Sequence, residues 1–118
     1  MTTTRTALGL AGLLTVTGAV HLVAPHRFDP AVPDWLPGSV LGWEIGSGVA
    51  ELASAALLVV PSTRRLGGCA ATALFVGVFP GNLDMVRTAR SPRARVGTLL
   101  RLPLQVPLVR WSWRVARG

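Results

Sequence analysis

The feature that most constrains the fold is a series of apolar windows, each about 18 residues long and carrying one charge or none. Half of the 118 residues are hydrophobic, 14% are charged, and the mean hydropathy is +0.49. A soluble bundle of this length needs a polar outer face on every helix, which these windows lack. The pattern predicts an all-α, membrane-embedded four-helix bundle with up-down-up-down topology, a single transmembrane domain over residues 1–118 with spans at about 6–24, 39–60, 66–86 and 96–113.

Prolines set the ends and interruptions of these expected spans. The segment 25–38 holds four prolines and two aspartates, which favours a structured loop anchored by Phe28, Trp35 and Leu36. Pro80 predicts that the third span either ends at Phe79 or continues with a kink to about Val86. Two prolines predict a kinked fourth span, with an interfacial amphipathic helix as the alternative. A cleaved signal peptide is the rival interpretation of the first span, but three further apolar segments need a membrane in either case.

All twelve basic residues are arginines, and the formal net charge is +7. The arginines gather in short tracts beside the apolar windows, where they contact lipid phosphates, so we expect a lipid bilayer as partner and no nucleic acid. They divide almost evenly between the two sides of the expected bundle, and the acids of the first loop favour a multi-pass protein of the cell membrane with cytoplasmic termini. Cys69 is the single cysteine, so the chain has no internal disulfide and no CxxC redox pair.

Ionisable and amide side chains lie inside the expected spans, where each costs free energy unless it faces the bundle interior and finds a partner. Glu44 and Glu51, seven residues apart, share a helix face. Arg101 and Gln105, one turn apart, form a donor face that we expect opposite Glu44 and Glu51 respectively. All four helices thus deliver polar groups to the side of the first loop, and the candidate ligand-binding or polar cluster is His21, Glu44, Glu51, Asn82, Asp84, Arg101 and Gln105.

This cluster has two interpretations. It is either a buried network that fixes the register of the helices or a site for a ligand or a proton. No catalytic residue, metal or other cofactor is assigned, since His21 with Glu44 supplies two of the three or four ligands that a metal site needs. On an adjoining face of the second span, the small residues Gly42, Gly46 and Ala50 predict the close approach of a neighbouring helix.

Three short motifs mark the chain: SGVAEL at 47–52, FPGN at 79–82 and RLPLQ at 101–105. With His21 and the proline-rich segment that follows it, they resemble the DoxX-like family of small membrane proteins over almost the whole chain. The resemblance implies a four-helix membrane bundle. Leu22 stands where the family commonly has an aromatic residue, and Gly81 where alanine is usual. The family pattern falls on His21, Glu51, Pro80, Asn82, Arg101, Pro103 and Gln105.

These observations lead to one main functional hypothesis and two alternatives. The main hypothesis is a non-enzymatic integral membrane protein that binds a quinone or lipid-like small molecule in the polar cluster, or supports a partner protein or homodimer. The first alternative is the membrane subunit of a quinone-linked redox enzyme, after the sulfur oxidation subunit that gives the resembled family its name. The second is a proton-coupled small-molecule transporter that uses Glu44 and Glu51 as carriers.

Overall fold

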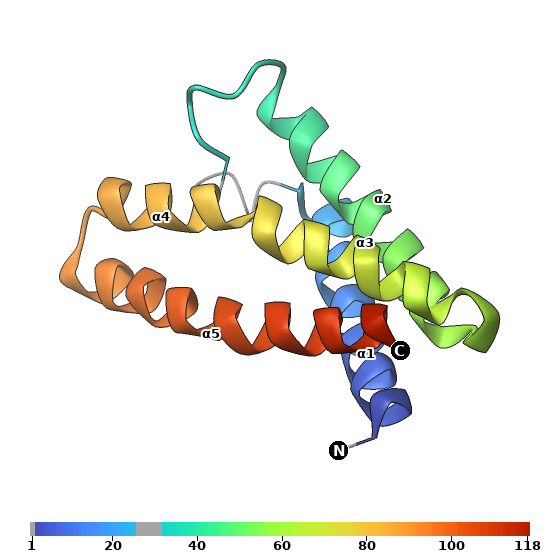
Figure 1. Ribbon diagram of the computed structural model, residues 1–118. Helices are drawn as coiled ribbons and strands as arrows, with labels where there is room; N and C mark the ends of the chain where they lie inside the picture. The colour runs from blue at the N-terminus through green and yellow to red at the C-terminus, as the bar shows by residue number, and fades with distance from the viewer. Residues whose placement is uncertain (1, 26–31) are drawn as a thin grey trace.

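The computed structural model describes residues 2–25 and 32–118, and within these ranges the chain is all-α, without strands. Its helices are α1 (Thr3–Val23), α2 (Val40–Val59), α3 (Arg64–Gly77), α4 (Phe79–Thr88) and α5 (Pro92–Arg117), and the short 3-10 helix η2 (Pro61–Thr63) precedes α3. Because α3 and α4 follow each other along nearly one line, the helices make four segments (Figure 1). The expected loop anchor Phe28 lies outside the described residues.

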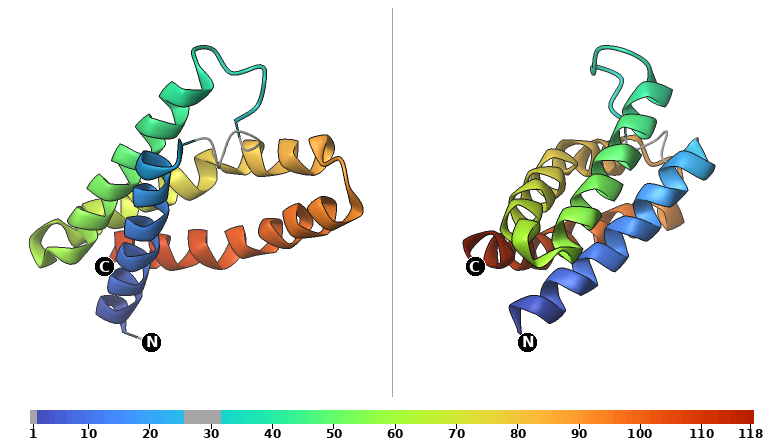
Figure 2. Two further views of the ribbon diagram at one scale, coloured as in Figure 1. Left: turned by 180° about the vertical axis from the view of Figure 1, so that it is seen from behind. Right: turned by 90° about the vertical axis from the view of Figure 1, so that its right-hand side faces the viewer.

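The four segments form two antiparallel hairpins that cross each other. α1 packs along α2, and α5 runs back along α3 and α4. Figures 1 and 2 show that α1 crosses α5 steeply, so the four segments do not share one axis. Each segment runs back against the one before it, as in an up-down-up-down topology. The two hairpins are inclined to each other and are not aligned as in a parallel-axis bundle. Contacts of α2 with α3 and of α1 with α5 hold the hairpins together.

Small polar residues begin three of the helices. The side-chain oxygens of Thr2, Ser39 and Ser91 accept hydrogen bonds from backbone N–H groups in the first turns of α1, α2 and α5. Each cap satisfies a donor that the helix itself leaves without a partner. α5 then has Pro92 at its first position, where the missing N–H costs nothing. These local signals explain why the helices begin where they do.

The expected kink in the third segment lies at Val78, between the end of α3 and the start of α4. Pro80 stands in the first turn of α4 and lacks the N–H that would continue the hydrogen-bond ladder of α3. The helix nevertheless resumes at once and continues to Thr88. α5 stays helical through both Pro103 and Pro107, so the fourth expected span lies within one long helix.

Glycines mark the closest contacts between helices. A Cβ atom on Gly48 would lie 2.9 Å from the carbonyl oxygen of Gly18, so α1 and α2 cross with their backbones nearly touching. α3 makes two similar contacts, through Gly67 with α2 and through Gly68 with the backbone of Ala116 in α5. The prediction for the stripe of small residues on α2 was wrong in this respect, because a Cβ on Gly46 would meet nothing within 4 Å. That stripe instead lines an open groove on the outer face of α2.

The apolar core lies where the hairpins cross. Alanine, leucine, phenylalanine and valine side chains from α1, α2, α3 and α5 form a single buried cluster. Among the segments that the structure describes, Thr3–Val23 and Pro61–Thr88 are long and apolar enough to cross a membrane, by length and composition alone. The expected spans at 39–60 and 96–113 are helical, as α2 and within α5, but neither helix is among the two that are apolar enough to cross a membrane.

Candidate polar cavity

A cavity of about 190 Å³ lies between the two hairpins, which we call the polar cavity. Every α-helix of the chain contributes to its wall. The apolar part of the wall comprises Leu13, Leu74, Phe75, Val78 and Leu108, and the polar part comprises Thr17, His21, Glu51, Asn82, Arg101 and Gln105. Six polar side chains around so small a volume make this the most chemically distinctive place among the described residues.

The wall formed by α1 and α2 carries a facing histidine and glutamate, which form an ion pair only when the imidazole is protonated. His21 Nε2 lies 3.5 Å from Glu51 Oε2, and each side chain is 14% exposed. The Thr17 side chain, one turn before His21 on the same face of α1, lies beside the Glu51 carboxylate. The two helices bring these groups together because Gly18 and Gly48 permit their close approach just beside them.

The wall formed by α4 and α5 carries hydrogen-bonding groups without protein partners. Asn82 is 5% exposed, and its side-chain amide forms no hydrogen bond with any described residue. Gln105 Oε1 is buried and has no hydrogen-bond donor there either. Arg101 Nη1 lies 3.8 Å from the thioether of Met85, and its guanidinium makes no ion pair within residues 2–25 and 32–118. Asn82 and Gln105 Oε1 are buried, and buried polar groups normally have partners, whereas Arg101 is exposed. The two carboxamides therefore make this wall suited to a bound molecule.

A second cavity, of about 390 Å³, adjoins the first, and we call it the tryptophan cavity. Trp35 and Trp43 line it, together with Pro33, Leu36 and residues around the α3–α4 kink. The indole N–H of Trp43 donates a 2.6 Å hydrogen bond to the carbonyl of Pro37, which ties the end of the first loop to α2. The two cavities share four wall residues, His21, Glu51, Leu74 and Val78, so they lie next to each other at the His21–Glu51 pair.

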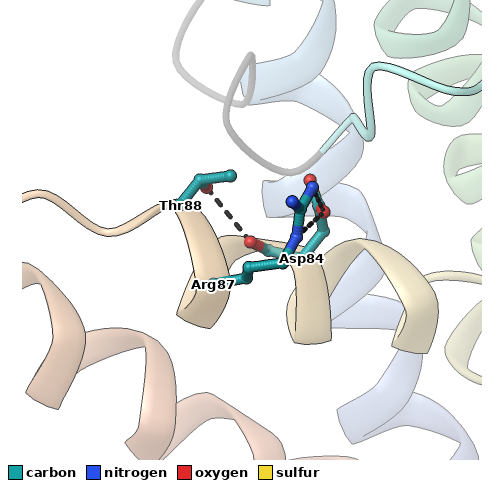
Figure 3. A network of polar contacts seen from close by, with 3 residues as sticks. All are labelled: Asp84, Arg87 and Thr88. Carbon is teal, nitrogen blue, oxygen red and sulfur yellow. Dashed lines mark hydrogen bonds and ion pairs between the residues drawn. The ribbon is translucent and has the colours of Figure 1, made fainter.

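Five of the seven residues expected in the polar cluster line the polar cavity, and Glu44 and Asp84 do not. Glu44 is 1% exposed and lies on the buried face of α2, nearly two turns from Glu51. Asp84 does not line the cavity. Its carboxylate accepts a 2.6 Å hydrogen bond from Arg87, and Thr88 donates to its backbone carbonyl (Figure 3). The predicted pairing of Arg101 with Glu44 was wrong, because Arg101 faces the same cavity as Glu51 and forms no ion pair with Glu44.

The sequence prediction did not include three residues that line the two cavities. Thr17 lies four residues before His21, and Trp43 and Ser47 lie eight and four residues before Glu51. Each spacing places the residue on the same helix face as a predicted cluster member. Helical periodicity alone was therefore enough to find them.

Metal-ligating side chains do not gather in the described part of the chain. No three His, Cys, Asp or Glu side chains there stand close enough to hold a metal ion together. His26 lies outside the described residues. The donors of the polar cavity are a guanidinium and two carboxamides, groups that bind oxygen atoms of organic molecules or anions rather than metals.

Fold and cavity together define an all-α protein of two crossed helical hairpins with a polar cavity between them. The chain belongs to a family described as a domain of unknown function (DUF8561), whose model matches residues 10–116. That match covers all of α2, α3 and α4, most of α1 and α5, and every residue of the polar cavity. No curated protein and no solved structure matches the chain.

Proposed function

We propose that this chain is a multi-pass integral membrane protein that binds a small lipid-soluble molecule, of quinone or lipid type, in the polar and tryptophan cavities. One observation carries the ligand proposal. Polar groups from all four segments surround a cavity, and the side-chain amides of Asn82 in α4 and Gln105 in α5 form no hydrogen bond with any described residue. A network that only fixed the helices in register would pair these groups with each other.

The outward faces of the helices support the membrane part of the proposal. α1 turns Val16 and Val23 outward at 63% and 85% exposure, and leucines, valines and tryptophans are exposed along α5 in the same way. Contiguous apolar surface on this scale is unusual for a soluble monomer and typical of a lipid-facing helix. α1 also buries Leu10 and Leu14 in the core, which supports its retention as a helix of the fold instead of removal as a signal peptide.

The DoxX-like resemblance remains part of the proposal. Of the seven positions that its pattern marks, five line the polar cavity and a sixth, Pro80, lines the tryptophan cavity. Positions that share a motif pattern and also surround one cavity favour a common binding role over a purely structural one. We propose a binding protein or a supporting subunit rather than an enzyme by itself.

The test blocks the tryptophan cavity without disturbing the packing. Gly77 lines this cavity, and a Cβ added there would meet nothing within 4 Å, so Gly77→Leu fills open space. Gly12→Leu is the matched control, since Gly12 lies in α1 with equal free space and lines neither cavity. Both variants replace glycine by leucine within a helix and gain the same helix propensity.

The protein is to be purified from native membranes in mild detergent, and bound small molecules are to be identified by mass spectrometry. We expect one class of lipid-soluble molecule to accompany the unmodified protein and Gly12→Leu, and to be lost from Gly77→Leu. Equal recovery from all three proteins, or from none, would count against ligand binding in these cavities. Release of the protein from membranes by alkaline carbonate would count against membrane insertion.

A further inference from the structure

We propose that the ligand is an amphiphile with a carboxylate headgroup, bound by Arg101, Asn82 and Gln105 in the polar cavity, with its alkyl chain in the tryptophan cavity. This inference rests on the proposed function and narrows it to one chemical class. Three observations lead to it: the donors on one wall, the charges on the two walls, and the apolar side chains of the adjoining cavity.

The α4–α5 wall supplies donors suited to an oxyanion. Arg101 contributes a planar guanidinium whose N–H groups match the two oxygens of a carboxylate, and Asn82 and Gln105 each contribute a carboxamide. Arg101 and Gln105 lie one turn apart on α5, and Asn82 faces them from α4. The only contact recorded for the Arg101 guanidinium in the described residues is the thioether of Met85, a weak acceptor. A carboxylate would accept hydrogen bonds from the Arg101 guanidinium and from the amide NH₂ groups of Asn82 and Gln105, whereas the buried Gln105 Oε1 is itself an acceptor and gains no partner from it.

The charges of the two walls favour a single negative charge on the ligand. Glu51 already has the imidazole of His21 as its partner at 3.5 Å. Arg101, in contrast, has no carboxylate partner within residues 2–25 and 32–118. Arg101 is an exposed side chain of α5, and in the proposed membrane a cation without a carboxylate partner is costly. An anionic headgroup would offset that cost. A neutral ligand would leave the charge of Arg101 uncompensated.

The tryptophan cavity adjoins the polar cavity and offers apolar and aromatic side chains. Leu74 and Val78 line both cavities, as do His21 and Glu51, so an alkyl chain that passes between them would contact these four residues. Beyond them the wall consists largely of Leu36, Trp43 and other apolar side chains. With about 390 Å³, the tryptophan cavity is within the usual size range of small-molecule sites. A headgroup on Arg101 would therefore place an alkyl chain beside the indoles.

The experiment measures whether binding depends on the carboxylate. A variant with Trp111→Phe and Trp113→Phe keeps Trp35 and Trp43 as the fluorophores, and it is to be placed in lipid nanodiscs. The probe is dodecanoic acid brominated along its chain, because bromine quenches a neighbouring indole. The matched probes are its methyl ester, which partitions into lipid at least as well, and a short-chain quinone whose quenching is measured in the same way.

We expect saturable quenching by the acid at concentrations about tenfold lower than by the ester. Arg101→Gln should abolish this preference, whereas Arg95→Gln should keep it, since Arg95 is an exposed arginine of the same helix that lines neither cavity. Glu51→Gln removes a negative charge from the opposite wall and should strengthen acid binding by a few-fold. Circular dichroism checks that each variant is folded.

Equal quenching by the acid and the ester would overturn the carboxylate headgroup even if no variant folded. Saturable quenching by the quinone alone would also overturn it, while leaving the proposed function intact. Absence of saturable quenching by all three probes would refute both the carboxylate headgroup and the proposed function.

Discussion

The crossing of α1 and α2 allows a sharp test, because two glycines of α2 differ only in which way they face. Gly48 faces α1, where a new Cβ would lie 2.9 Å from the Gly18 carbonyl oxygen and 2.9 Å from the Cβ of His21. Gly46, two residues earlier, faces open space. We therefore compare Gly48→Ala with Gly46→Ala, two changes of identical chemistry in one helix.

The magnitude follows from two opposing terms. Alanine in place of glycine inside a helix stabilises by about 0.8–1 kcal/mol, and both variants gain this. At Gly48 the added methyl also forces the helices apart, since a backbone carbonyl cannot move aside as a flexible side chain can, and overpacking of this kind costs about 1–3 kcal/mol. The two variants should thus differ by about 1–3 kcal/mol, with Gly46→Ala the more stable. For a chain of this length roughly 4 °C per kcal/mol is expected, so their melting temperatures should differ by roughly 4–12 °C.

The assay is thermal unfolding followed by circular dichroism, with both variants in the same detergent and at the same concentration. Gly46→Ala should melt above the unmodified protein, and Gly48→Ala should melt below Gly46→Ala. The reverse order would show that α2 packs through Gly42, Gly46 and Ala50, as the small-residue stripe suggested. The face of α2 that contains Gly48 would then not be the one that contacts α1.

Two further substitutions test contacts at the opposite end of the core. Arg64→Met should lower the free energy of unfolding by about 1–3 kcal/mol, because Arg64 donates 2.8 and 2.9 Å hydrogen bonds to the carbonyls of Leu58 and Val59 at the end of α2. An unchanged melting temperature would refute that role. Thr72→Val should cost about 1 kcal/mol by removing the 2.9 Å hydrogen bond between α3 and the buried Ser112 of α5, and urea denaturation that showed no loss would contradict it.

Much of the candidate site could be predicted from helical spacing. Arg101 and Gln105 are one turn apart and face one cavity, as expected. The same rule separates Asn82 from Asp84: two residues correspond to about 200° around a helix, so the two side chains point to opposite sides. The sequence prediction treated both as members of one cluster, although the periodicity of α4 already excluded one of them.

The sequence could not predict how α2 is rotated about its own axis, because that rotation depends on tertiary contacts. Gly46 and Gly48 are equally small, and the stripe of small residues at every fourth position favoured Gly46. Packing of α1 against one side and α3 against another places Gly48 at the crossing instead. The steep angle between the hairpins follows likewise from Gly67 and Gly68, two adjacent glycines that let α3 approach α2 and α5 at once. No local pattern distinguishes such a pair from glycines that merely face outward.

Two crossed hairpins cannot both stand along the normal of a bilayer. α1, with 21 residues, is about 31 Å long, close to the roughly 30 Å of hydrocarbon, whereas α5, with 26 residues, is about 39 Å long and fits by tilting. In the proposed membrane setting a thinner bilayer would increase the tilt of α5 more than that of α1, and so change the crossing angle. Because the polar cavity lies between these helices, bilayer thickness would act directly on its width. The lipid composition of the membrane would then change the width of the polar cavity without any lipid binding in it.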